Sequence, residues 1–303
     1  MEREVVYKGQ ILTREEQELR RKYYVEEFTE KHYRIKISKE TQEKIGEIKQ
    51  FLEENKDFSY MIMFNHTYYG DPLFAGYLAN LIDPENTRQI VAPVSALHTK
   101  PKEGNLSLGK RAENLFTKTI NEMAQSATAK TLSVVQANDK TSSTEEAQKS
   151  YFEFFDELKR LKNDGPIGLI VCPEGHRSED GKMQSFERGS VLMAKSAKPL
   201  VVIGLGIHFE PRKFCGMRIR SYFRDTLNHL FNRKINLTVN NYLIINKEDK
   251  IPKTEVMEQM VADALPVDLV REENLSEERK KELAQMPKTR TFVWKLRPIK
   301  KKH

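Results

Sequence analysis

The sequence predicts an α/β protein with a mostly parallel central sheet covered by helices and preceded by an N-terminal helical segment. Short apolar runs of strand length alternate along the chain with amphipathic stretches that have helical spacing. The runs 60–64 and 167–171 are apolar throughout, as expected of buried strands. Turn residues such as Asn163-Asp164-Gly165-Pro166 separate the helices from the strands. Strands that alternate with helices are typical of parallel sheets.

The elements are predicted in the following order. Residues 14–54 have a helical pattern, in which 41–55 place Ile45, Ile48, Phe51 and Leu52 on one stripe. Later helices are expected from residue 71 and over 111–123, 144–162, 188–197 and 253–265. In the helix 144–162, one face is expected to hold Phe152, Phe155, Leu158 and Leu161. Strands are expected over 60–64, 89–94, 132–136, 167–171 and 200–207, and less clearly over 235–239 and 242–245.

The chain is divided into three parts on this basis. Its 303 residues suit one large domain or two ordinary ones. We expect an N-terminal helical segment over 1–55, an α/β domain over 56–270 and a basic C-terminal tail over 271–303.

Charge is concentrated in the tail. The net charge is +7 and the pI about 9.1, which favours a nucleic acid, a phosphorylated substrate or an anionic membrane as partner. Residues 279–303 hold ten Lys or Arg and one acid and so carry +9, which leaves −2 for the first 278 residues. The basic pI is therefore a property of the tail, which favours docking over a nucleic-acid-binding fold.

Other features of the sequence bear on location. Cys172 and Cys215 are too few for a disulfide framework or a four-cysteine zinc site. The acidic start Met-Glu-Arg-Glu does not resemble a signal peptide, and no stretch approaches the ~18 apolar residues of a membrane span. We expect a cytoplasmic protein, with peripheral membrane contact left open.

The first loop of chemical interest, residues 65–72, follows the strand 60–64. In it His66 and Asp71 are five positions apart, with Asp71-Pro72 expected to begin a helix as N-cap and first residue. A tight turn would bring the Asp71 carboxylate to one ring nitrogen of His66 and leave the other nitrogen to accept a proton. The alternative is that Asp71 only caps its helix and His66 packs at the end of the strand.

The second loop, residues 171–178, follows the strand 167–171. Gly175 permits close approach of the backbone, and the planar guanidinium of Arg177 suits a phosphate or carboxylate. Glu174 would orient Arg177 or accept from a substrate hydroxyl. A surface turn with an exposed ion pair is the alternative.

Together, Asn-His-x-x-x-x-Asp and Pro-Glu-Gly-x-Arg-Ser resemble the glycerolipid acyltransferase family, which includes the glycerol-3-phosphate and 1-acylglycerol-3-phosphate O-acyltransferases. The block Phe186-Glu187-Arg188-Gly189-Ser190 with Ala194, and the block 198–202, also resemble segments of that family. The resemblance covers roughly residues 55–265, in the order found in the family.

The resemblance implies acyl transfer from acyl-CoA or acyl carrier protein to a hydroxyl of glycerol-3-phosphate or lysophosphatidic acid. It implies that His66 is the general base and that Asp71 holds it. It also implies that Glu174, Gly175, His176 and Arg177 bind the acceptor phosphate. No metal or cofactor is expected, and no nucleic acid is expected as partner. An alcohol needs a base to attack at neutral pH, and an anionic acceptor needs a fixed cation, so the chemistry is consistent with these residues.

Departures from the family pattern leave the acceptor open. His176 stands where Thr is common, and the segment 134–140 lacks an Arg, for which Lys140, Lys100 or Lys102 are candidate substitutes. A different lysophospholipid or alcohol acceptor is the second hypothesis. The third is a basic nucleic-acid-binding protein, and a non-catalytic lipid-binding member of the family is a fourth.

Residues 279–303 also predict a surface contact. Aromatic and aliphatic residues, including Phe292 and Trp294, lie among their basic residues, a composition that suits an anionic membrane surface. A solvated tail, or a final strand over 292–296 that packs on the domain, is the alternative.

Overall fold

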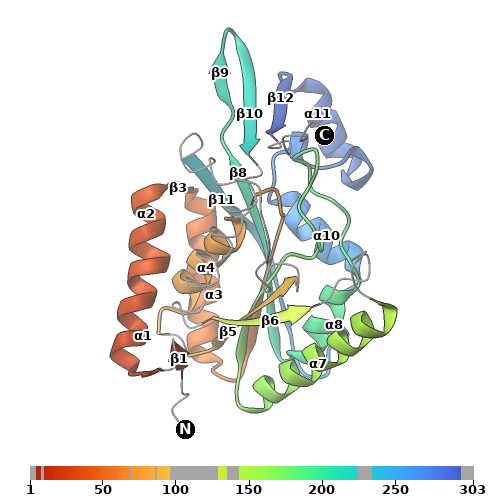
Figure 1. Ribbon diagram of the computed structural model, residues 1–303. Helices are drawn as coiled ribbons and strands as arrows, with labels where there is room; N and C mark the ends of the chain where they lie inside the picture. Colours follow the sequence, from red (N-terminus) through yellow and green to blue (C-terminus); the bar gives the residue numbers. More distant parts are fainter. Residues whose placement is uncertain are drawn as a thin grey trace, which may run out of the picture.

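The computed structural model describes residues 5–7, 10–68, 70–85, 87–95, 129–134, 143–223 and 234–294 (Figure 1). A seven-stranded sheet lies at the centre, in the order β3-β11-β8-β4-β7-β5-β6. Its strands are β3 (Arg34–Ile37), β4 (Ser59–Phe64), β5 (Gln89–Ser95), β6 (Lys130–Val134), β7 (Ile167–Val171), β8 (Leu200–Phe209) and β11 (Lys234–Ile245). All neighbouring pairs are parallel except β11 and β8. The predicted α/β fold with a mostly parallel sheet is confirmed.

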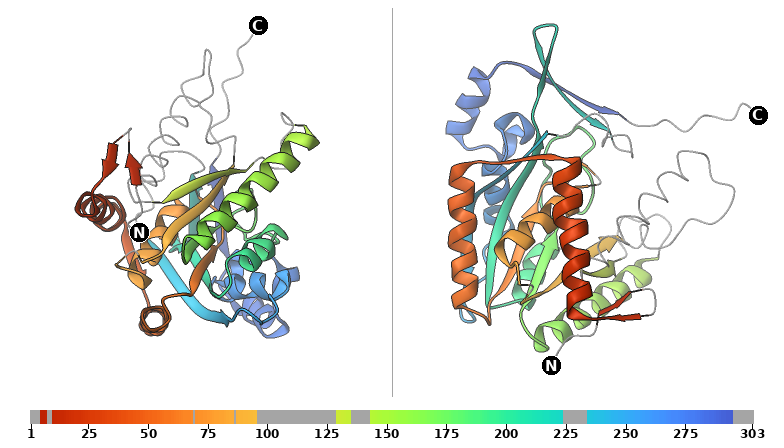
Figure 2. Two further views of the ribbon diagram at one scale, coloured as in Figure 1. Left: turned by 90° about the horizontal axis from the view of Figure 1, so that it is seen from below. Right: turned by 90° about the vertical axis from the view of Figure 1, so that its left-hand side faces the viewer.

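Helices cover both faces of this sheet (Figures 1 and 2). One face carries α3 (Lys39–Glu54) and α4 (Asp71–Ile82), and α1 (Arg14–Arg21), the π-helical turn Lys22–Glu27 and α2 (Phe28–His32) follow one another alongside them. The other face carries α7 (Thr144–Asn163), α8 (Gly189–Ser196) and α10 (Thr254–Asp263). None of the helices in the described ranges is both long and apolar enough to cross a membrane.

The sheet divides the core into two clusters, and successive side chains of each strand point to opposite clusters. Tyr60 and Ile62 of β4 point into the cluster with α3 and α4, whereas Met61 and Met63 point into the cluster with α7, α8 and α10. This alternation explains why β4 is buried at every position and apolar from Tyr60 to Phe64, because both of its faces are covered.

The remaining elements lie outside the central sheet. Strands β1 (Val5–Tyr7) and β2 (Gln10–Leu12) pair with each other, and β9 (Arg212–Phe214), β10 (Met217–Phe223) and β12 (Thr289–Trp294) form a three-stranded sheet. Two 3₁₀ turns (Val267–Leu269 and Glu272–Asn274) and α11 (Glu277–Gln285) connect α10 to β12. The hairpin β9–β10 projects beyond the body of the molecule (Figure 1).

Several predicted elements differ from those observed. The helical pattern over 14–54 is interrupted by β3, in which Ile35 and Ile37 alternate with basic residues and pack on the core while the strand pairs with β11. The two expected strands over 235–245 are one strand, β11, with an irregularity between Val239 and Tyr242. The expected helix 111–123 lies outside the described residues.

The buried face of α7 also differs from the prediction. Phe152 is 68% exposed, and the buried positions are Phe154, Leu158 and Leu161. Successive steps of three residues fall short of a helical turn and drift around the axis, whereas steps of four and three stay on one side.

Basic residues at the C-terminal end do not all face solvent. Arg279, at the start of the expected basic stretch, donates to the carbonyl oxygens of Ala262 and Leu265 and pairs with Asp263 at 3.4 Å. It thereby bonds one carbonyl oxygen in the last turn of α10 and one just beyond the end of that helix. Residues 289–294 form β12 in parallel register with β10, as in the alternative of a final strand, whereas 295–303 lie outside the described residues.

Candidate functional site

Adjacent strands position the two loops. Strands β4 and β7 are parallel neighbours with Met63 opposite Val171, so both end at the same edge of the sheet. The loop with His66 leaves β4 and the loop with Glu174 leaves β7. Ligands of α/β proteins gather at this carboxyl edge, as expected from the sequence.

The structure brings His66 and Asp71 into contact. The ring nitrogen Nδ1 of His66 lies 3.2 Å from Oδ2 of Asp71. The side chain of Asp71 is fully buried, whereas that of His66 is 19% exposed. A carboxylate that accepts from Nδ1 favours the tautomer in which Nδ1 carries the proton and Nε2 presents a lone pair. The imidazole therefore has one nitrogen held by the protein and one able to accept a proton.

Asp71 holds the whole turn as well as the imidazole. Its Oδ2 accepts from the backbone N–H groups of Thr67 and Tyr68 at 2.8 and 2.7 Å. Gly70, rather than Asp71, is the N-cap of α4, so the expected cap is displaced by one residue and Asp71 begins the helix. Burial raises the pKa of the Asp71 carboxyl above its ordinary value, and the contacts with His66 and the two N–H groups oppose that rise.

Glu174 links the loop after β7 to the loop after β4. It is fully buried, its Oε1 accepts the backbone N–H of His66 at 2.7 Å, and its Oε2 accepts that of Gln184 at 2.9 Å. Burial raises the pKa of Glu174 well above its ordinary value, and these two N–H groups oppose the rise. With both carboxylate oxygens held by backbone groups, Glu174 is a positioning residue for His66 in this structure. The sequence suggested contact with Arg177 or substrate instead.

A further residue of the second loop, Ser178, contacts the backbone of His66. The backbone N–H of Ser178 donates to the His66 carbonyl oxygen at 2.8 Å, so Arg177 is one residue from a direct contact with His66. Arg177 is half-buried and His176 is exposed. Gly175 has φ +68°, in the left-handed region that suits glycine, and an added Cβ would lie 3.2 Å from Oε1 of Glu187.

Sequence reasoning did not identify Asn65 as an anchor of the site. Its buried side chain donates to the Ile207 carbonyl oxygen at 2.9 Å and accepts the Ile207 N–H at 2.8 Å. In this way it pairs with β8 as a strand residue would, and it fixes the chain just before His66. The signal was an amide residue directly after an apolar strand, where a buried side chain needs partners for both of its ends.

Tyr68 and Cys172 complete the surroundings of Asp71. Tyr68 is buried, stacks with Phe74 and has its hydroxyl 3.0 Å from that of Tyr33, so it packs beneath the loop. Tyr69 lies outside the described residues. Burial raises the pKa of the Cys172 thiol well above its ordinary value, and the nearby carboxylates of Glu174 and Asp71 raise it further. A neutral thiol is a poor nucleophile, which leaves His66 as the reactive group of this cluster.

Among the described residues no group of three or more His, Cys, Asp or Glu side chains could hold a metal ion. The candidate substitutes Lys100, Lys102 and Lys140 lie outside the described ranges. Compared with known proteins, the sequence matches no family model and no curated protein.

Proposed function

We propose that the protein is an O-acyltransferase that moves a fatty acyl group from an acyl thioester to the hydroxyl of glycerol-3-phosphate or lysophosphatidic acid. The observation that carries the proposal is the contact of His66 with the buried Asp71 at the carboxyl edge of the sheet. The sequence resemblance of the two loops supplies the reaction type, and the adjacency of β4 and β7 supports it by bringing those loops together.

In the proposed reaction Nε2 of His66 takes the proton of the acceptor hydroxyl as its oxygen attacks the thioester carbonyl carbon. The carbon–sulfur bond then breaks, and the thiolate leaving group takes the proton from the imidazolium. Asp71 stabilises the imidazolium between these steps, because a carboxylate at Nδ1 favours the charged ring.

Acceptor binding is assigned to the exposed part of the second loop. Arg177 provides a planar cation for phosphate, and Gly175 allows the backbone turn that carries it. His176 is exposed beside Arg177 and adds a second donor. Because His176 departs from the family pattern, a different lysophospholipid or alcohol is the alternative acceptor.

The test is release of free thiol from acyl-CoA or acyl carrier protein in the presence of a mixed pool of acceptors, with products identified by mass spectrometry. Wild-type protein should release thiol and acylate one acceptor class, and His66→Ala should lose about 10²- to 10⁴-fold in kcat/KM. His176→Thr serves as the companion variant, because it should change the preferred acceptor and keep transfer. Unchanged turnover in His66→Ala would overturn the assignment of the base.

A further inference from the structure

We infer that the sheet β9–β10–β12 is a docking surface for an anionic lipid bilayer. We call this sheet with its flanking residue Lys288 the basic finger. The inference rests on the proposed function in one respect, since a lipid acceptor or acyl donor would bind at that bilayer.

The finger carries charge of one sign. Residues 212–220 contain Arg212, Lys213, Arg218 and Arg220, and residues 287–294 contain Lys288 and Arg290, with no Asp or Glu in either stretch. Arg220 is used inside the molecule, where it is buried, donates to Asp268 and reaches the Phe209 carbonyl oxygen. The outer cations therefore set the character of the finger.

The register places two of these cations directly opposite each other. Lys213 of β9 pairs with Arg218 of β10, and neither has an ion-pair partner in the part of the chain that the structure describes. Like charges opposite each other on neighbouring strands destabilise the pair. A surface of phosphate groups would relieve this repulsion, so the arrangement favours an anionic partner.

An apolar residue stands at the end of the hairpin. Met217 follows the turn at Cys215-Gly216 and is 40% exposed. An exposed apolar side chain at a projecting tip, with cations behind it, suits the boundary between headgroups and acyl chains. A nucleic acid would contact the cations but gives no reason for an exposed methionine beside the turn, whereas a bilayer accounts for both.

The finger also lies on the side of the candidate site. Strand β8 runs parallel to β4, with Leu205 opposite Phe64, and leads directly into β9. Both His66 and the hairpin therefore follow the carboxyl ends of neighbouring strands, and the hairpin projects from that edge (Figures 1 and 2). Contact of the finger with a bilayer would turn the edge that bears His66 toward the lipid.

The test is co-sedimentation of the full chain with vesicles of equal parts phosphatidylcholine and phosphatidylserine, compared with vesicles of phosphatidylcholine alone. Wild-type protein should prefer the anionic vesicles. The double variant Lys213→Ala/Arg218→Ala should partition about 25-fold more weakly, from about 1 kcal/mol for each cation near the surface. Met217→Ser should bind at least about fourfold more weakly, because it removes more apolar surface than one buried methylene group.

The matched control removes the same charge elsewhere. Lys159 of α7 and Lys195 of α8 are exposed near the helix ends that lead into the amino ends of β7 and β8. Lys159→Ala/Lys195→Ala should therefore bind as wild type does. Far-ultraviolet circular dichroism and the unfolding midpoint check that each variant is folded.

The inference would be overturned if the wild type showed no preference for anionic vesicles, or if the finger and control variants lost vesicle binding equally. It would also be overturned if Lys213→Ala/Arg218→Ala lost binding to a single-stranded oligonucleotide but kept its binding to vesicles. Acyl transfer is measured separately with glycerol-3-phosphate or a short-chain lysophosphatidic acid as acceptor and a short-chain acyl-CoA as donor, which need no bilayer. Vesicle binding without any transfer would overturn the proposed function and leave the finger. Acyl transfer without vesicle binding would overturn the docking surface and leave the proposed function standing.

Discussion

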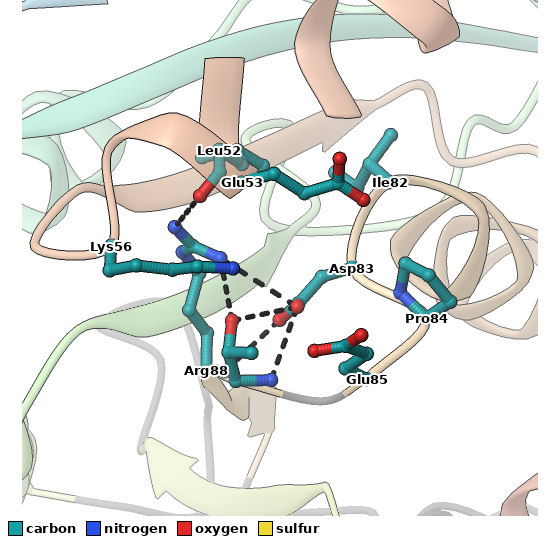
Figure 3. Close-up of a pocket in the computed structure, with 9 residues that line it drawn as sticks. Leu52, Glu53, Lys56, Ile82, Asp83, Pro84, Glu85 and Arg88 are labelled. Carbon is teal, nitrogen blue, oxygen red and sulfur yellow. Dashed lines mark hydrogen bonds and ion pairs between the residues drawn. The ribbon is translucent and has the colours of Figure 1, made fainter. Parts of the chain in front are cut away.

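Buried acids lie at both edges of the central sheet, but among the described residues only the acid at the amino edge is paired with an arginine or lysine. There, Asp83 after α4 lies 3.6 Å from the guanidinium of Arg88, which precedes β5 (Figure 3). At the carboxyl edge, Asp71 and Glu174 contact backbone N–H groups and His66, and neither contacts a Lys or Arg in the described ranges.

The amino edge uses its charge to close the fold. Arg88 is buried and donates to the carbonyl oxygens of Phe58, Leu52 and Asn55 at 2.6, 2.8 and 3.0 Å, and so satisfies backbone groups at the end of α3 and before β4. Thr87 and the backbone of Arg88 hold Asp83 in turn. Every part of this cluster has a partner, which is typical of a structural ion pair.

The carboxyl edge leaves its charge unbalanced. Oδ1 of Asp71 is buried without a hydrogen-bond partner among the described residues. Burial raises the pKa of both carboxyls, and repulsion from Asp71 raises that of Glu174 further. A positive charge on His66 would balance this pair. The amino edge is therefore complete as it stands, whereas the carboxyl edge has a buried carboxylate that a protonated His66 would balance, as the proposed function requires.

The largest expected effect comes from one substitution made at both edges. Asp71→Asn should lower kcat/KM for acyl transfer about 10²- to 10⁴-fold, because the amide does not stabilise the imidazolium. Asp83→Asn should lower the free energy of unfolding by about 3 kcal/mol, because Arg88 loses its buried counter-charge, and should leave the kcat/KM of the folded protein unchanged. Thiol release and urea unfolding measure the two. Similar activity losses in both variants would remove the distinction between the edges.

Removal of the cation should have a stability effect of the same order. Arg88→Ala should lower the free energy of unfolding by about 3–5 kcal/mol, because Asp83 loses its counter-charge and three carbonyl oxygens lose their donor. Lys56, exposed beside Arg88 in Figure 3, is the matched control, and Lys56→Ala should change it by no more than about 0.5 kcal/mol. Equal unfolding midpoints for the two variants would mean that Arg88 contributes nothing specific.

A smaller effect is expected where β8 meets α10. An added Cβ at Gly206 would overlap the carbonyl oxygen of Ala264, and one at Gly204 would lie 2.8 Å from backbone atoms of Met260. Gly206→Ala should therefore lower the free energy of unfolding by about 1–3 kcal/mol and, because Ile207 anchors Asn65, also reduce activity. Gly76 of α4 has open space around it, so Gly76→Ala should stabilise by about 0.5–1 kcal/mol. Urea unfolding of both variants checks the contrast in sign.

The sequence was sufficient for the strands on which the site depends. The run 167–171 predicted β7 with the same bounds, and the run 60–64 predicted β4 within one residue, because strands buried on both faces are apolar throughout. It was insufficient for β3 and for the β9–β10 hairpin, whose short, basic sequences become strands only through pairing with distant partners.

For the site, spacing alone suggested the contact between His66 and Asp71, because a turn of five residues can close on itself. The contact of Glu174 with the His66 backbone could not be inferred in this way, since it joins residues 108 positions apart through the register of β4 and β7. The role of Gly204 and Gly206 of β8 could not be inferred from the sequence, because only the three-dimensional structure shows how closely α10 approaches that strand.

The smallest predicted effect concerns pH and tests whether the carboxyl edge is unbalanced. Glu174 has a raised pKa in the folded protein, so folding takes up a proton between the ordinary Glu pKa of about 4.3 and the folded value. The stability from this group is present below the ordinary pKa and is lost as pH rises through the folded pKa. Glutamine does not titrate in the folded or the unfolded state. In Glu174→Gln the free energy of unfolding should therefore decline less steeply as pH rises.

Glu157 provides a control of opposite sign. Contacts with Arg160 and Lys130 lower its pKa to about 2, so its stabilisation is present above the ordinary pKa and is lost as pH falls. Glu157→Gln should therefore flatten the loss of stability on the acid side. Urea unfolding followed from acid to neutral pH compares both variants with wild type. If Glu174→Gln changed the curve in the same direction as Glu157→Gln, Glu174 would be a stabilised carboxylate, and the contrast between the two edges would fail at its central residue.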